Sequence, residues 1–227
     1  MTDVHGAASS ARSEILSRIR SITGSGPQAE SPREAWQAIP RLYRQHGTLD
    51  SAQCIELLED RLRDYGARVH HAGPSEIPRT IAMILAEREK QRILLSPAVS
   101  ASWLPDGFPF VADAALSYQA LDACDGVLTG CTVAIATTGT LVLCHGAGVD
   151  AEHDQGRRAL TLIPDYHLCI VARSAVVQTV PEAMHLLEPY SGQPITFISG
   201  PSATADIEMT RIQGVHGPRI LDVVIAE

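Results

Sequence analysis

The stretch Arg92-Ile93-Leu94-Leu95, with the pattern that leads up to it, decides the fold class of this chain. Its continuous apolar run is typical of a strand buried on both faces, as in a parallel sheet. Three elements are predicted before this strand. In chain order they are a helix over 50–66, a short strand over 67–71 and an amphipathic helix from residue 77. Because helices and strands keep alternating, we expect a layered α/β fold.

The first 49 residues follow a different pattern, which predicts an N-terminal helical arm and linker in front of an α/β domain over 50–227. Apolar residues recur at helical spacing over 9–22, and Ser31-Pro32-Arg33-Glu34 has the form of a capping box. An isolated helix of this length is only marginally stable in water. The arm therefore either packs on its own domain or captures a partner subunit.

The charge of the chain argues against several kinds of partner. A net charge of −8 and a pI near 5.6 do not favour a generic surface for nucleic acid or an anionic membrane. Lys90 is the only lysine, which argues against Schiff-base and P-loop mechanisms. Residues 1–12 lack the pattern of a signal peptide, and no run is long enough to span a membrane. We therefore expect a cytoplasmic protein without membrane insertion.

The metal-binding residue types are scattered. The five cysteines never form a C-x-x-C pair, which is typical of reduced thiols and argues against an iron–sulfur cluster in this chain. The other candidate ligands lack the tight spacing of a helical zinc site, so no metal site is predicted. These candidates are His145, His153, His167, His216, Asp206 and Glu208.

The segment 199–209, followed by Gly214-Val215-His216-Gly217-Pro218, predicts two tight loops around a short helix, between apolar strands at 194–198 and 220–226. Gly200 and Pro201 favour a sharp turn, after which Ser202 and Thr204 are candidate N-caps. A loop that leaves a strand and opens a helix is where open α/β sheets hold ligands. The alternative is a capped connection without a ligand.

Within that segment, acidic and basic groups suggest proton transfer. Asp206 and Glu208 fall in the first turn of the expected helix, where its dipole favours carboxylates. His216 is the candidate for acid–base catalysis, because Gly217 beside it leaves the ring accessible. A hydrogen-bonded structural role is the alternative for His216, and also for His167.

A second candidate binding element is the turn Thr137-Thr138-Gly139-Thr140, between two apolar strands. Its glycine and hydroxyls suit a phosphate or carboxylate, although ordinary β-turns use the same residue types. Arg157 and Arg158 are candidates to clamp an anion held by Thr138, Gly139 and Thr140. Ion pairing of these arginines with nearby carboxylates is the alternative; the candidates are Asp150, Glu152 and Asp154.

Three blocks of this sequence resemble the lactate-utilisation protein C family, which is characterised by the LUD domain. They are Gly200-Pro201-Ser202-x-Thr204-Ala205-Asp206-Ile207-Glu208 with its Gly214–Pro218 continuation, the run 134–143, and Leu162-Ile163-Pro164 followed by His167. In the family pattern a glutamate often stands where this chain has Thr137. If family chemistry uses that carboxylate, this member lacks the step.

The resemblance implies a three-layer α/β/α fold, similar to the ribose-5-phosphate isomerase, glucosamine-6-phosphate deaminase and CoA-transferase group. It also implies an accessory or co-catalytic subunit in the oxidation of L-lactate to pyruvate, itself free of clusters and working with iron–sulfur sister proteins. The alternatives are an independent isomerase- or transferase-type enzyme on a small phosphorylated or CoA-linked acid, and an anion-sensing module. The expected ligand-binding residues are Thr138, Gly139, Thr140, Arg157, Arg158, His167, Gly200, Ser202, Thr204 and Gly217.

Overall fold

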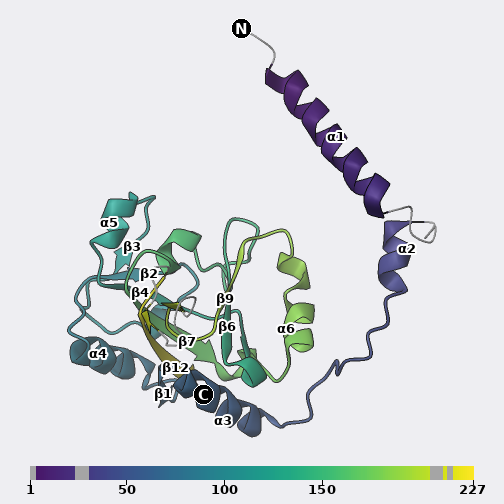
Figure 1. Ribbon diagram of the computed structural model, residues 1–227. Helices are drawn as coiled ribbons and strands as arrows, with labels where there is room; N and C mark the ends of the chain where they lie inside the picture. Colours follow the sequence, from purple (N-terminus) through teal and green to yellow (C-terminus); the bar gives the residue numbers. More distant parts are fainter. Residues whose placement is uncertain (1–3, 24–30, 205–211, 214–216) are drawn as a thin grey trace. The chain divides into compact units, whose positions relative to one another are not determined.

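A computed structural model of the chain describes residues 4–23, 31–204, 212–213 and 217–227. The chain divides into two compact units, Met1–Tyr43 and Arg44–Glu227. The first unit holds the helices α1 (Val4–Thr23) and α2 (Pro32–Gln37), in the segment for which the sequence predicts a helical arm (Figure 1). Helix α2 begins after the predicted N-cap residue Ser31, whose hydroxyl accepts a hydrogen bond from the backbone N–H of Glu34.

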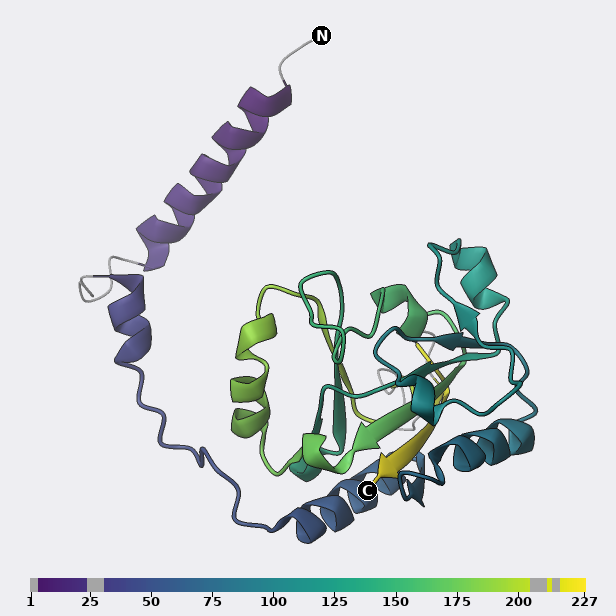
Figure 2. The same ribbon diagram turned by 180° about the vertical axis from the view of Figure 1, so that it is seen from behind.

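The second unit is built on a six-stranded sheet whose paired strands all run parallel. In spatial order the strands are β1 (Arg68–Ala72), β12 (Ile220–Ala226), β7 (Tyr166–Ala172), β4 (Gly126–Thr129), β2 (Ile93–Leu95) and β3 (Val111–Ala112). The predicted α/β class is therefore confirmed. The last strand of the chain inserts between the first strand and β7, as the two opposite views show (Figures 1 and 2).

Both faces of this sheet are covered, because side chains alternate along each strand. Helix α3 (Ser51–Asp64) packs on the face that presents Val223 and Ile225 of β12. Helix α4 (Ile77–Glu87) packs on the opposite face, which presents Val224 and Ala226. A short helix, α5 (Tyr118–Asp122), adds Leu121 to a smaller cluster that includes β2 and β4. Helices therefore flank the central sheet on both sides.

The structure also contains a four-stranded sheet, which the sequence did not predict as a unit. Its order is β8 (Val176–Val177), β5 (Val133–Ile135), β6 (Thr140–Cys144) and β9 (Ile195–Ile198), with β5, β6 and β9 antiparallel. One face packs with α3 through Leu141 and Leu143, and the other packs against α6 (Val180–Leu186). Residues 47–49 attach to this part through backbone hydrogen bonds to the side chains of Gln178 and Glu182.

The segment after Pro201 contains a short strand that the sequence did not predict. Ala203–Thr204 forms β10, which pairs in antiparallel register with β11 (Ile212–Gln213). The helix that Ser202 or Thr204 was expected to cap falls on residues outside those that the structure describes. None of the helices that the structure describes is long and apolar enough to cross a membrane.

A buried ion pair ties α4 to the central sheet. The carboxylate of Asp222, in β12, accepts two hydrogen bonds from the guanidinium of Arg88 and one from the hydroxyl of Tyr166, at 2.7, 2.5 and 3.0 Å. A buried charge is costly unless it is paired and fully hydrogen-bonded, and this one is. Burial and the Asp222 carboxylate both raise the pKa of Tyr166, so its hydroxyl stays protonated and donates.

Candidate functional site

A cavity of about 400 Å³ lies at the amino ends of β7 and β12. His167 and Leu221, the second residues of these two strands, form part of its wall. Five of the predicted ligand-binding residues line this cavity, although they come from four separate segments of the chain. They are Arg158, His167, Gly200, Ser202 and Gly217.

The loops around this cavity are held together by backbone contacts. The N–H of Ser202 donates a hydrogen bond to the carbonyl of Pro218, 2.8 Å away, and so joins the two predicted loops. Gly200 has φ +83°, a conformation that favours glycine, and a Cβ at this position would collide with the side chain of Tyr65, the C-cap residue of α3. The sharp turn predicted at Gly200 is therefore confirmed, and it lets the loop approach the helix closely.

The predicted turn Thr138-Gly139-Thr140 adjoins the cavity without lining it. The hydroxyl oxygens of Thr138 and Thr140 lie 2.7 Å apart, and that of Thr140 lies 2.8 Å from the Ser199 hydroxyl. Ser199 does line the cavity. The three hydroxyls thus form a hydrogen-bonded chain that ends at the cavity wall.

The two neighbouring arginines have different surroundings. The guanidinium of Arg157 forms a bidentate pair with Asp113, with both N–O distances at 2.6 Å, and also donates to the carbonyl of Leu116. This pairing lowers the pKa of Asp113. Ion pairing was one of the expected alternatives for Arg157, but its partner is not one of the three carboxylates proposed from the sequence. Arg158 lines the cavity, and no carboxylate of the described residues pairs with it.

Two buried histidines lie at the cavity. His167 is part of its lining, and His145 contacts the lining residue Thr196. Nε2 of His167 lies 2.7 Å from the Thr129 hydroxyl, and burial lowers the pKa of His167 to about 4. His145 lies between the carbonyl of Gly156, at 3.2 Å, and the hydroxyl of Thr196, at 3.0 Å. Because a carbonyl only accepts, Nδ1 of His145 carries the proton, and Nε2 of the neutral ring accepts from Thr196. Burial also lowers the pKa of His145, so both rings are neutral near pH 7.

Thr196 and Ser199 are cavity residues that the sequence did not single out, because they lie in and just after an apolar strand. The predicted catalytic residues His216, Asp206 and Glu208 lie outside the described residues, as does the side chain of Thr204. Among the side chains that the structure describes, no three of His, Cys, Asp or Glu are grouped so as to hold a metal ion.

Comparison with known proteins identifies the family. Residues 17–226 match the model of the LUD domain. The chain belongs to the LUD domain family. It is 42% identical over 219 residues to the "Lactate utilization protein C" of Deinococcus radiodurans, covering 95% of both chains. It is 30% identical over 225 residues to the "Lactate utilization protein C" of Anoxybacillus flavithermus, covering 90% of this chain and 94% of the other.

A crystal structure of a DUF162 family protein from Deinococcus radiodurans has the same fold as this LUD domain, with a TM-score of 0.66. The two sequences are 37% identical, and the match covers 79% of this chain and all of the other. The family predicted from the three sequence blocks is therefore confirmed.

The arrangement of this LUD domain suits an anion better than a cation. The guanidinium of Arg158 supplies positive charge at the cavity, and Ser199 and Thr196 supply hydroxyl groups. No carboxylate is present among the described residues that line the cavity. His145 and His167 are neutral, so they offer hydrogen bonds rather than charge.

Proposed function

We propose that this protein takes part in lactate utilization, as an accessory or co-catalytic subunit in the oxidation of L-lactate to pyruvate. The support is the extent of the match, since a relative named for lactate utilization shares 42% of its residues over 95% of both chains. Iron–sulfur proteins are the partners in this proposal, and the clusters belong to them. The five cysteines of this chain never form a C-x-x-C pair in the sequence, which is the pattern expected if the clusters are held by the partners.

Its local role, in this proposal, is to bind a small organic anion in the cavity at the amino ends of β7 and β12. The observation that carries this is Arg158, whose guanidinium has no carboxylate partner among the described residues, whereas its neighbour Arg157 is paired. A guanidinium matches a carboxylate in charge and in planar geometry. Lactate and pyruvate both present a carboxylate next to an oxygen that can accept a hydrogen bond from the Ser199 hydroxyl. The Thr196 hydroxyl donates to His145, so it can only accept, from the hydroxyl of lactate.

The second candidate function is an independent enzyme on a phosphorylated or CoA-linked acid. The cavity, at about 400 Å³, has room for more than a three-carbon acid, and the hydroxyls of the threonine turn lie directly behind the lining residue Ser199. A phosphate also matches a guanidinium, so geometry alone favours neither ligand over the other.

Thermal unfolding of the full chain tests the ligand. L-Lactate, pyruvate, a sugar phosphate and a CoA thioester are each added at millimolar concentration to the wild type, Arg158→Ala and Arg79→Ala. Arg79 is the control, because it is exposed on α4 and outside the cavity. We expect L-lactate or pyruvate to raise the unfolding temperature of the wild type and Arg79→Ala, but not of Arg158→Ala. An equal shift in Arg158→Ala contradicts the site, and a shift with only the phosphate or the thioester supports the second function.

The partners require a separate test. The tagged chain is captured from its host grown on lactate, and the eluate is examined by mass spectrometry and by an iron assay. We expect cysteine-rich, iron-bearing proteins in the eluate of the wild type. An iron-free protein recovered alone, from cells that consume lactate, contradicts the subunit proposal. Capture from cells grown on another carbon source is the control for non-specific partners.

A further inference from the structure

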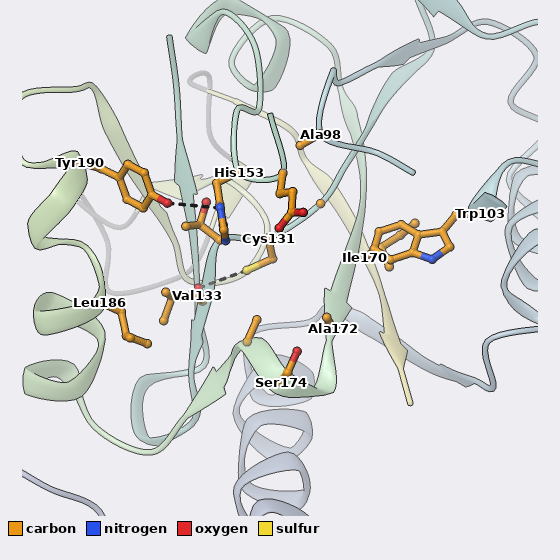
Figure 3. A pocket seen from close by; sticks show the side chains of 14 residues that line it. Ala98, Trp103, Cys131, Val133, His153, Ile170, Ala172, Ser174, Leu186 and Tyr190 are labelled. Atoms are coloured by element: carbon orange, nitrogen blue, oxygen red, sulfur yellow. Dashed lines mark hydrogen bonds between the residues drawn. The ribbon is translucent and has the colours of Figure 1, made fainter. Parts of the chain in front are cut away.

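A second cavity, of about 470 Å³, lies at the opposite edge of the central sheet (Figure 3). Its lining includes Gly130 and Cys131, which directly follow β4, and Ala172, at the end of β7. Figure 3 shows Trp103 on one side and His153 with Tyr190 on the other. The cavity therefore lies at the carboxyl ends of the parallel strands, between the two sheets.

The topology marks this edge as a ligand position. Strands β2 and β4 are neighbours, but the chain leaves them in opposite directions. After β2 it runs outward to β3, and after β4 it runs inward to β7 by way of the second sheet. Open α/β sheets bind ligands in the crevice at such a switch point, outside the carboxyl ends of the strands.

One wall of the cavity carries a fixed hydrogen-bond acceptor. The Asp150 carboxylate accepts from Nδ1 of His153 at 2.7 Å and from the Tyr190 hydroxyl at 2.5 Å. A carboxylate only accepts, so Nδ1 of His153 carries a proton, and Nε2 is the ring nitrogen left to accept a hydrogen bond. These two hydrogen bonds lower the pKa of Asp150 to about 2, so the Asp150 carboxylate is charged at neutral pH. None of the described residues bonds to Nε2.

The remaining lining is mostly apolar, with a few neutral polar groups and one carboxylate. The apolar side chains are Ala98, Trp103, Val133, Ile170, Ala172, Ala175 and Leu186, and the neutral polar ones are Cys131, Thr132 and Ser174. Glu152 adds a carboxylate, and the described residues that line the cavity include neither lysine nor arginine. The charge is thus the reverse of that in the cavity beside Arg158.

We propose that this second cavity binds an uncharged or cationic small molecule with a flat apolar ring, which packs against Trp103 and donates a hydrogen bond to Nε2 of His153. The face of Trp103 interacts most favourably with a stacked or edge-on aromatic ring. The lining carboxylate of Glu152 repels an anionic ligand. This ligand differs in charge from the one proposed for the first cavity. A negative result for one cavity therefore does not contradict the proposal for the other.

Three small molecules of similar shape test which ligand charge the second cavity prefers. Benzamide is neutral, benzamidine is cationic and benzoate is anionic, and each presents the same ring. The variant Trp36→Phe leaves Trp103 as the only tryptophan, so its fluorescence reports on the cavity. At pH 8 we expect benzamidine and benzamide to change the Trp103 emission with saturation in the millimolar range, and benzoate to bind at least tenfold more weakly. Equal binding of benzoate, or no saturable change with any probe, overturns the proposal.

A matched pair of variants on α6 locates the binding. Leu186 and Met184 have exposed fractions of 50% and 51%, but only Leu186 lines the cavity. In the Trp36→Phe background we expect Leu186→Ala to weaken benzamide binding several-fold and Met184→Ala to leave it unchanged. His153→Ala removes the acceptor and is expected to weaken benzamide more than toluene, which has no donor. Equal effects of Leu186→Ala and Met184→Ala contradict binding in this cavity.

Discussion

The Thr140 hydroxyl oxygen lies 2.8 Å from the hydroxyl oxygen of Ser199, a residue 59 positions later in the sequence. The pairing of β6 with β9 brings them together, since Leu141 is opposite Ile198 in this antiparallel ladder. Thr140 also lies 2.7 Å from the hydroxyl oxygen of Thr138. The threonine turn and the loop that lines the first cavity are therefore one hydrogen-bonded unit.

We predict that this hydroxyl chain contributes to stability as a unit. Thr140→Val and Ser199→Ala should each lower the free energy of unfolding by about 1 kcal/mol, because each leaves a hydroxyl without its partner. The double variant should lose at least about 0.5 kcal/mol less free energy of unfolding than the two single variants lose together. The reason is that either single change already breaks the hydrogen bond between the two hydroxyls. Urea unfolding of the four proteins measures this. Strict additivity would show that the two hydroxyls are not coupled.

Helix α3 supports both turns beside the first cavity. A Cβ at position 139 would lie 2.6 Å from Cβ of Arg61, and a Cβ at position 200 would collide with Tyr65, one turn further along the same helix. Both glycines also have positive φ, at +59° and +83°. The glycines therefore serve two purposes, namely an unusual backbone conformation and close approach to α3.

We predict that crowding at position 139 costs more than its backbone conformation does. Gly107 is the control, because it also has positive φ, at +75°, but a Cβ there meets no atom within 4 Å. Gly107→Ala should lower the free energy of unfolding by about 1–2 kcal/mol, which is the backbone strain alone. Gly139→Ala should cost at least about 1 kcal/mol more, because α3 must shift. Chemical denaturation measures both, and equal losses would mean that the crowding is relieved without cost.

The sequence predicted what depends on local patterns. The helix at α3 begins at a capping box in which Asp50 and Gln53 bond each other's backbone, as the spacing of these residues indicates. The cavity residues Arg158 and His167 were singled out from their type and position. The pairing of β12 between β1 and β7 was not predictable in this way, because the register of distant strands depends on packing across the whole sheet.

Arg157 and Arg158 show which features the local sequence pattern could not predict. Arg157 and Arg158 are adjacent, and the sequence offered the same alternatives for both. The structure distinguishes them through Asp113, which lies 44 residues upstream and is brought close only by the fold. In the same way, the short strand at Thr204 could not be predicted from its residue type, since its partner Ile212 comes from the other side of the loop.

Our last prediction concerns pH and the buried ring of His167. An unfolded histidine has a pKa of about 6.5, and burial lowers the pKa of His167 to about 4 in the folded protein. The unfolded chain therefore binds this proton more readily than the folded one. Stability from the neutral ring is fully present above about pH 6.5 and is lost as the pH falls toward 4, by up to about 3 kcal/mol.

His167→Gln should flatten this dependence, because glutamine does not titrate. Its side chain can still bond the Thr129 hydroxyl. Burial lowers the pKa of His145 in the same direction, so part of the slope should remain. The control is His185→Gln, since His185 is exposed on α6 and its loss should leave the slope unchanged. Urea unfolding of the three proteins between pH 4.5 and 7.5 measures the slopes. An unchanged slope in His167→Gln would show that the pKa of this ring is the same in the folded and unfolded states.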